Sequence, residues 1–249
     1  MLAKNNYSKK RFIFNLYEKK IPKEYKCSFC NSTSLYFENN FFCESELKSS
    51  ADYHQCDDWS INDVSLIFSG ILTCKACNEK HAVSGIGHVE EIYDEEYDRY
   101  FANVFIPQYF HPTLNIFEIP SNTPDNLKEI IKSAFSLAWG DFPAAGNRLR
   151  AALEVIINTL INVGSPKETL GNKINRIPNA HSDIRIIMTA IKWLGNEASH
   201  DAELIECDLA FAFEATELIL KKLYPDTDKT KHILSLAEQI NNSKGSFIK

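Results

Sequence analysis

Two C-x-x-C pairs constrain the fold of this chain more than any other feature of its sequence. The first pair is Cys27 and Cys30, and the second is Cys74 and Cys77. Two residues between the cysteines let both thiolates reach one ion from a tight turn, and two such turns complete a tetrahedral site. Strand-like segments flank both pairs. We therefore predict a zinc ribbon whose Zn²⁺ is structural, because four thiolates leave no open coordination position for catalysis.

The segment between the two pairs is 43 residues long, from 31 to 73, which is more than a minimal ribbon needs. We expect an insertion there. It contains Cys43, His54 and Cys56, whose irregular spacing leaves two interpretations open: a second metal site, or buried free thiols and a surface imidazole, which we favour. His81 and His88 fall on or near the next expected strand and are interpreted as strand residues.

The cysteine content and the charge narrow the cellular compartment and the binding partners expected for the protein. Seven cysteines are an odd number, and their grouping favours metal binding in a reducing compartment over disulfides. A net charge of −6 argues against the whole chain acting as a nucleic-acid binder. However, residues 1–26 carry eight Lys and Arg against two Glu. This basic arm either contacts phosphates or is a solvated segment.

The apolar segments are too short for a membrane protein. None approaches the ~18 residues that span a bilayer, and the N-terminus lacks the apolar core of a signal peptide. We expect a cytoplasmic protein with no membrane partner.

Prolines between Pro107 and Pro124 mark a boundary, because their density precludes a regular helix. An acidic run at 90–100 precedes them and is interpreted as a solvated linker or helix, since its carboxylates do not converge by themselves. We predict an N-terminal arm and zinc-ribbon domain in residues 1–106, a proline-rich linker in 107–122 and a helical bundle in 123–249. The fold class is therefore α+β.

Beyond the linker, apolar residues recur with the 3.6-residue period of a helix. Short connections between such segments are typical of an antiparallel bundle. The expected helices cover residues 127–138, 143–162, 170–177, 183–194 with an extension to 200, and 201–224, followed by a short helix in the tail.

One face of the fourth expected helix is unusually polar. Lys192, Asn196 and His200 are spaced four apart, so an amine, an amide and an imidazole stack along it. The face is either a site or a polar junction between helices. In the second case Gly195 permits close helix approach, and the amide and imidazole bond to neighbouring helices.

Two motifs resemble a known family. The segment 119–154 has a proline-led entry, a helix, a turn at Gly140, an Ala144–Ala145 pair and the sequence Arg-Ala-Ala-Leu-Glu from Arg150. The second motif is K-W-L-G-N-E-A-S-H, from Lys192 to His200. Together they resemble the domain-of-unknown-function family numbered 4145, over about residues 107–225. A cysteine-paired ribbon upstream is also common in that family.

The family is placed in the HEPN superfamily of helical bundles. Many of its members are metal-independent ribonucleases, toxins or phage-defence effectors, and others are inactive scaffolds. Active members have an Arg a few residues before the His. Here the basic residue is Lys192, eight positions before His200, and Asn196 is the nearer polar residue.

The resemblance implies a bacterial defence or toxin-type protein that binds RNA and cleaves it as an endoribonuclease. His200 would act as base or acid, Lys192 or Arg150 would stabilise the phosphate charge, and Asn196 would orient it. A symmetric homodimer would bring two such sets to one cleft.

The alternative is a non-catalytic module that recognises nucleic acid or a defence-system partner protein. An accessory subunit of a restriction system is one such case.

Overall fold

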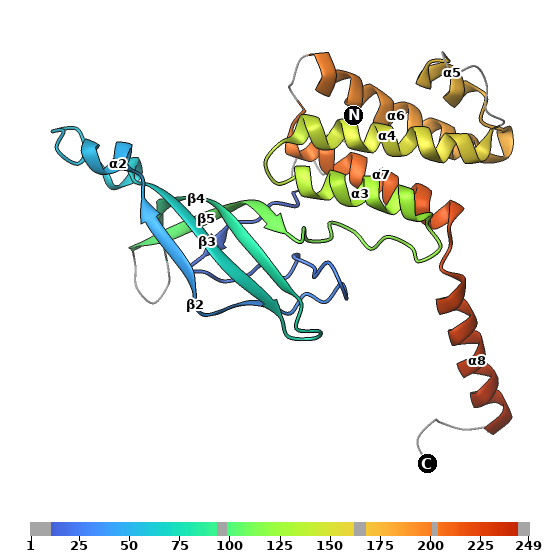
Figure 1. The fold of residues 1–249 in the computed structure, drawn as a ribbon, viewed down its shortest axis with the longest axis horizontal. Helices are drawn as coiled ribbons and strands as arrows, with labels where there is room; N and C mark the ends of the chain where they lie inside the picture. The colour runs from blue at the N-terminus through green and yellow to red at the C-terminus, as the bar shows by residue number, and fades with distance from the viewer. Residues whose placement is uncertain (1–10, 94–98, 162–167, 201–203, 244–249) are drawn as a thin grey trace.

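The structure is a computed structural model that describes residues 11–93, 99–161, 168–200 and 204–243. Within these ranges the side chains of residues 39, 196–200 and 227–231 lie outside the description. A curved antiparallel sheet forms the N-terminal part, and helices form the C-terminal part (Figure 1). The mixed α+β class predicted from the sequence is confirmed. We call these parts the sheet region and the helical region.

The sheet is a meander of long strands to which a short first strand is added. Its spatial order is β1-β5-β4-β3-β2, and every neighbouring pair is antiparallel. It is larger than the ribbon that the cysteine spacing predicts. The strands are β1 (Leu16–Tyr17), β2 (Leu35–Glu46), β3 (Ser65–Cys74), β4 (Lys80–Ile92) and β5 (Tyr100–His111).

The expected insertion between the cysteine pairs is present. It consists of β2, the short helix α2 (Lys48–Tyr53), a 3₁₀ turn at Ile61–Asp63 and most of β3. Ser60 caps the 3₁₀ turn, since its hydroxyl accepts from the Asn62 amide at 3.1 Å. The insertion therefore widens the sheet by one strand.

Side chains alternate between the two faces of the sheet. On β3, Leu66 and Phe68 are buried, whereas Ile67 and Ser69 are exposed. The buried face packs against aromatic and aliphatic residues from the N-terminal segment and from the end of the first long helix. We call the opposite surface the outer face.

Strand β5 enters the segment predicted as a linker. It continues through Pro107 to His111, although proline has no amide hydrogen for a sheet ladder. Pro107 pairs with Gly85, where the register between β4 and β5 shifts. The irregularity accommodates the proline, which is why a boundary drawn at residue 107 falls inside a strand.

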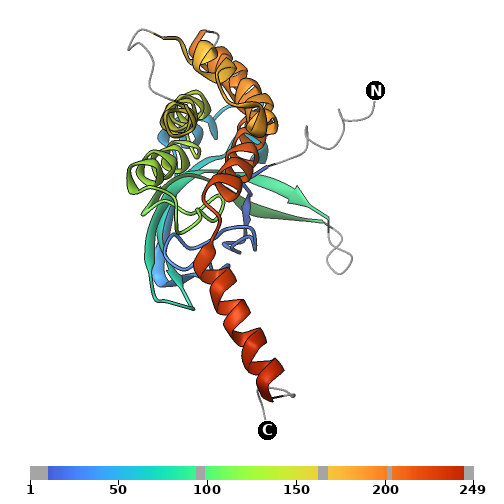
Figure 2. The same cartoon turned by 90° about the vertical axis from the view of Figure 1, so that its right-hand side faces the viewer.

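The helical region is centred on α4 (Phe142–Leu160), which packs against the other helices α3, α5, α6 and α7 (Figures 1 and 2). Asp141 caps α4 by accepting from the Ala144 amide at 2.8 Å, and a proline occupies the first turn. The other helices are α3 (Asp125–Leu137), α5 (Leu170–Asn175), α6 (Ser182–His200), α7 (Glu206–Leu223) and α8 (Thr227–Ser243), with a 3₁₀ turn at Asn179–His181.

Each region buries an aromatic side chain in the core of the other. Trp139, just after α3, packs in the sheet core, with its ring centroid 4.6 Å from that of Phe110 and 5.4 Å from that of Tyr25. Phe12, before β1, packs in the helical core against Phe213, at 5.7 Å between centroids. The two cores are therefore mechanically joined.

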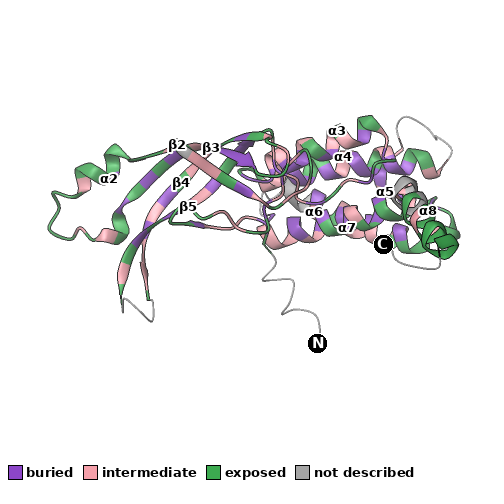
Figure 3. Ribbon diagram, turned by 90° about the horizontal axis from the view of Figure 1, so that it is seen from below, coloured by how far each residue is buried: buried purple, intermediate pink, exposed green. Residues whose placement is uncertain are grey.

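Helix α8 extends away from both regions (Figures 1 and 2). Residues 232–243 are exposed apart from the half-buried Leu236, as Figure 3 illustrates. In the described part of the chain, no helix combines the length and the apolarity needed to cross a membrane.

Candidate metal centre and helical polar cluster

The two C-x-x-C pairs form two turns with the same backbone. The residue after each second cysteine is an asparagine with positive φ, 58° at Asn31 and 63° at Asn78. The amide of Asn31 donates to the Cys27 carbonyl at 3.0 Å, and the amide of Asn78 donates to the Cys74 carbonyl at 2.8 Å. Asparagine tolerates the left-handed region better than most residues, so the local sequence suits this turn.

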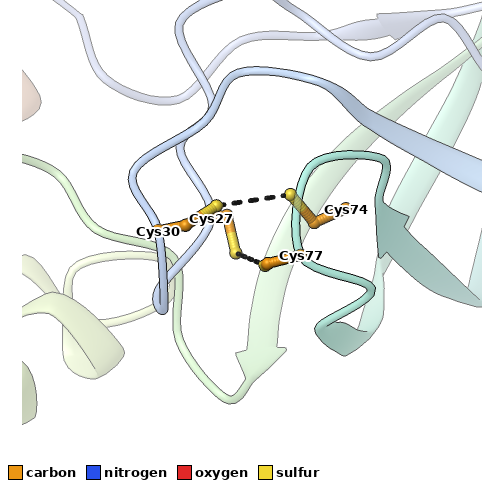
Figure 4. Close-up of side chains that lie close together, drawn as sticks. All are labelled: Cys27, Cys30, Cys74 and Cys77. Atoms are coloured by element: carbon orange, nitrogen blue, oxygen red, sulfur yellow. Dashed lines mark hydrogen bonds between the residues drawn. The ribbon is translucent and has the colours of Figure 1, made fainter.

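The four sulfur atoms converge between these turns (Figure 4). Sγ of Cys27 lies 3.7 Å from Sγ of Cys77, and Sγ of Cys30 lies 3.6 Å from Sγ of Cys74. All four lie within 4.8 Å of one another. A tetrahedral zinc–thiolate site with bonds of ~2.3 Å has sulfur–sulfur edges of about 3.8 Å. The cluster therefore fits one tetrahedral, thiophilic ion.

The sulfurs also influence one another's ionisation. Burial raises the pKa of Cys74, but the amides of Cys77 and Ala76 donate to its sulfur and lower its pKa to about 6. The Glu79 amide lowers the pKa of Cys77, but desolvation and the neighbouring sulfurs raise it to about 12. Four thiolates so close together repel one another, so a cation is needed to hold all of them ionised.

Contacts outside the C-x-x-C motifs fix the turns in place. The Asn115 side chain donates to the Ser28 carbonyl at 3.1 Å and to Oδ1 of Asn31 at 2.7 Å. The Lys75 amide, in the second turn, donates to the Ser34 carbonyl at 2.9 Å, which ties this turn to the residue that precedes β2. Sequence reasoning missed Asn115, because nothing in its local pattern indicates a contact with a turn more than eighty residues away.

The remaining candidate ligands do not join this cluster. Sγ of Cys43 lies 2.9 Å from Oγ of Ser69, Nε2 of His54 lies 2.9 Å from Oε1 of Glu46, and Cys56 is exposed. In the described ranges the four-cysteine cluster is the one group of at least three such ligands that converges. The favoured interpretation is wrong about the burial of the thiols, because Cys43 and Cys56 are both exposed, whereas His54 lies on the surface as expected.

The two histidines of β4 are strand residues, as expected. His81 is fully buried, and its Nδ1 lies 2.8 Å from the Pro112 carbonyl oxygen. His88 is partly exposed, with Nε2 at 2.7 Å from Oε1 of Glu90.

The predicted polar face of the fourth helix lies on α6, whose backbone is helical through His200. The side chains of Asn196 and His200 lie outside the described ones, so their roles stay a prediction. Nζ of Lys192 lies 4.0 Å from the ring centroid of Trp193.

Arg150 on α4 lies against Gly195, one turn after Lys192 on α6. A Cβ added at Gly195 would lie 3.5 Å from Cβ and from Cδ of Arg150. Such a Cβ would make ordinary van der Waals contacts, so the helix packing does not require glycine at this position, contrary to the expectation from the sequence. The structure does bring the Arg150 side chain to the helix that carries Lys192.

Two family models match the chain. Residues 15–110 match a domain of unknown function, DUF8608, and residues 132–243 match a domain of unknown function, DUF4145. The resemblance to the family numbered 4145 is thereby confirmed, over a stretch that begins and ends later than expected. The match of the sheet region was not anticipated from the sequence. Comparisons with curated proteins and with solved structures gave no match.

Proposed function

We propose that this chain is an HEPN-like RNA-binding protein of the bacterial defence or toxin type, and that it cleaves RNA by metal-independent acid–base chemistry. The observation that supports this function is the packing of Arg150 against Gly195. It places the aliphatic part of the Arg150 side chain, from α4, against the helix that carries Lys192, Asn196 and His200. Two cations from neighbouring helices suit a phosphate group.

The proposed chemistry needs a base, an acid and a cation. His200 takes the proton of the ribose 2′-hydroxyl, and the resulting oxygen attacks the adjacent phosphorus. Lys192 and Arg150 stabilise the charge that develops on the phosphoryl oxygens, and Asn196 orients them. A protonated imidazole from a second copy gives its proton to the departing 5′-oxygen, which leaves a cyclic phosphate.

This scheme includes a homodimer and a cytoplasmic setting. A two-fold axis beside α6 would bring both copies of His200 to one phosphate. In the sheet region, Zn²⁺ is the ion proposed for the cysteine cluster in a ribbon-like arrangement. Its role is structural, and the reducing cytoplasm keeps the four thiols available for it.

The test is an RNA cleavage assay with a chelator present, so that contaminating metal-dependent nucleases are silent. We expect His200→Ala to abolish cleavage and to leave RNA affinity within about threefold, because the imidazole carries little of the phosphate contact. Lys192→Ala and Arg150→Ala should weaken RNA binding and reduce its salt dependence.

Glu214→Ala, on the exposed side of α7, is the matched control and should change neither property. Cleavage that continues at the wild-type rate in His200→Ala would refute the mechanism. RNA affinity that is equal in all the variants would refute the binding site.

A second candidate function is a non-catalytic module that binds a defence-system partner protein. Ile186 and Trp193 favour it, because both lie on α6, two turns apart, and are 70% and 59% exposed. Large apolar side chains grouped on a surface are typical of protein interfaces. In this case Trp193→Glu would abolish the protection of cells against phage, whereas His200→Ala would retain that protection.

A further inference from the structure

A groove crosses the outer face of the sheet, and its lining includes neither the four clustered cysteines nor any residue of α6. Its volume is about 740 Å³, and its residues come from β2, β3, β4, β5 and the turn between α3 and α4. Gly140 of that turn lies directly against β5, since an added Cβ would be 3.2 Å from the Gln108 carbonyl oxygen. The volume is in the range of small-molecule sites, which often lie where two structural units meet.

The strand register arranges the floor of the groove in two rows. In the first row Cys43 pairs with Ser69, Ser69 with Ser84, and Ser84 with Tyr109. This row crosses four strands and carries a thiol, two aliphatic hydroxyls and a phenol. We call it the hydroxyl row.

The second row runs beside the first and is apolar. Ile67 pairs with Ile86, and both line the groove. Ile67 and Ile86 are 45% and 41% exposed, which is high for isoleucine in a sheet. A ligand that covers both rows must have one apolar edge and one edge that forms hydrogen bonds.

An irregularity in β5 turns two neighbouring side chains toward this groove. Ser84 pairs with Tyr109 but Gly85 pairs with Pro107, so Gln108 is an extra residue on β5. Consecutive strand residues normally face opposite sides, yet Gln108 and Tyr109 are both exposed and both line the groove. Such bulges often re-aim side chains at functional sites.

Tyr109 provides a flat surface beside Gln108. Its ring is nearly parallel to that of His111, at 7° and 6.5 Å between centroids. It is still 49% exposed, so a ligand can stack on it. The Gln108 amide supplies two donors and an acceptor, the combination that reads the edge of a base.

The groove has little charge to offer a ligand. Glu44 is the one Asp, Glu, Lys or Arg residue among those that line it, and its carboxylate lies 3.6 Å from Nζ of Lys19. A phosphate group would find no basic side chain within this lining. The chemistry therefore favours an uncharged, flat ligand with hydrogen-bonding atoms along one edge.

We propose that this groove binds one unpaired nucleobase, stacked on Tyr109 and read by Gln108 and the hydroxyl row. The inference rests on the proposed RNA-binding function, because the base belongs to the RNA whose phosphate the helical region holds. Base stacking on aromatic side chains is a common mode of single-strand recognition. A peptide strand would need a free sheet edge instead of a face, and a lipid chain would leave the hydroxyl row unpaired.

The experiment measures nucleoside binding to the full chain by calorimetry and by NMR saturation transfer. Adenosine, guanosine, cytidine and uridine are the probes because they carry no phosphate. At least one should bind with a dissociation constant near or below about 1 mM. Ser84→Ile, which fills the hydroxyl row, and Tyr109→Ala, which removes the stacking surface, should each weaken it at least tenfold.

Ser65→Ile is the matched control. Ser65 is exposed on the same face of β3, pairs with His88 and lies outside the groove lining. It should leave nucleoside affinity unchanged. Circular dichroism and metal content should match the wild type in all three variants, since isoleucine suits an exposed strand position.

The outcomes separate this inference from the proposed function. If no nucleoside binds, or if Ser84→Ile and Tyr109→Ala bind as well as Ser65→Ile does, the nucleobase site is refuted. RNA binding that depends on Lys192 would then still support the proposed function. If nucleosides bind at the groove but RNA affinity does not depend on Lys192 or Arg150, the groove stands as a nucleobase site and the function proposed for the helical region fails.

Discussion

The sheet region and the helical region are held together by different kinds of side chain. Phe68, Phe105 and Phe110 dominate the sheet core, and the cysteine turns lie at its border. The helical core is built mainly from leucine, isoleucine and alanine along α3, α4, α6 and α7. The sheet therefore depends on a few local fixing points, whereas the helices depend on burial that is spread over many residues.

This contrast predicts that the stability lost on substitution depends more strongly on the position of the residue in the sheet region than in the helical region. The variants below test that idea from the largest expected effect to the smallest.

Cys74→Ser should have the largest effect, because it removes a fully buried sulfur from the cluster. Structural zinc sites contribute on the order of 10 kcal/mol to folding, so losing one ligand should cost the sheet most of its stability. We expect well under one equivalent of zinc by atomic emission. Cys43→Ser is the control and should keep a full equivalent. A full equivalent in Cys74→Ser would show that the cluster is no metal site.

Trp139→Ala should reduce the stability of the whole chain by about 3–5 kcal/mol. The indole packs against Phe12, Tyr25 and Phe110, so the cavity would weaken the contact between the two regions. In a urea titration of this variant, zinc release and loss of the helical circular dichroism signal should occur at different urea concentrations. Trp193→Ala, at an exposed tryptophan, should change stability by less than about 0.5 kcal/mol. Coincident transitions in Trp139→Ala would mean that the regions do not depend on this contact.

Glu206→Ala tests how the N-terminal segment is held on the helical region. Its Oε1 accepts from the amides of Phe12 and Ile13, each at 2.9 Å. Loss of the one acceptor that two partly buried amides share should cost about 1–3 kcal/mol, and Glu206→Gln should recover part of it. Protease cleavage before β1 should accelerate in the alanine variant. The control is Glu217→Ala, which removes only a surface pair with Lys221. Equal cleavage in both variants would contradict the role of Glu206.

Asp183→Asn should have the smallest effect, because the carboxylate is solvent-exposed. Its bonds to the Lys222 ammonium and to the Ile184 amide lower the pKa of Asp183. A lowered pKa stabilises the fold above the ordinary carboxyl pKa and ceases to do so as pH falls through the lowered value. The difference in urea midpoint between wild type and variant should therefore shrink between about pH 5 and pH 2. A difference that stays constant over this range would disprove the linkage.

Sequence patterns predicted the features that local spacing encodes. The C-x-x-C spacing predicted the two cysteine turns because each turn is a short-range structure, whereas the pairing of β2 with β3 brings the two turns together. The 3.6-residue period located the helices for the same reason. Strand β5 continues past the boundary drawn at Pro107 because a bulge lets it accept a proline, and a bulge depends on the partner strand.

Contacts between distant segments were beyond these patterns. Asn115 contacts the first cysteine turn, and Glu206 contacts the N-terminal segment. Neither contact has a local sequence signature, because the partners are far apart in the sequence. The groove was missed for the same reason. Its rows combine residues from four strands, and only the register shows that Ser69, Ser84 and Tyr109 are neighbours.

The sequence by itself determined the mixed α+β class, the cysteine turns and the period of the helices, because these follow from interactions among residues close in the chain. Only the tertiary structure decided that Arg150 lies against Gly195, that Trp139 and Phe12 join the two cores, and that the outer face carries a groove. Those features depend on strand register and helix packing, which arise when distant segments bury their apolar faces against one another.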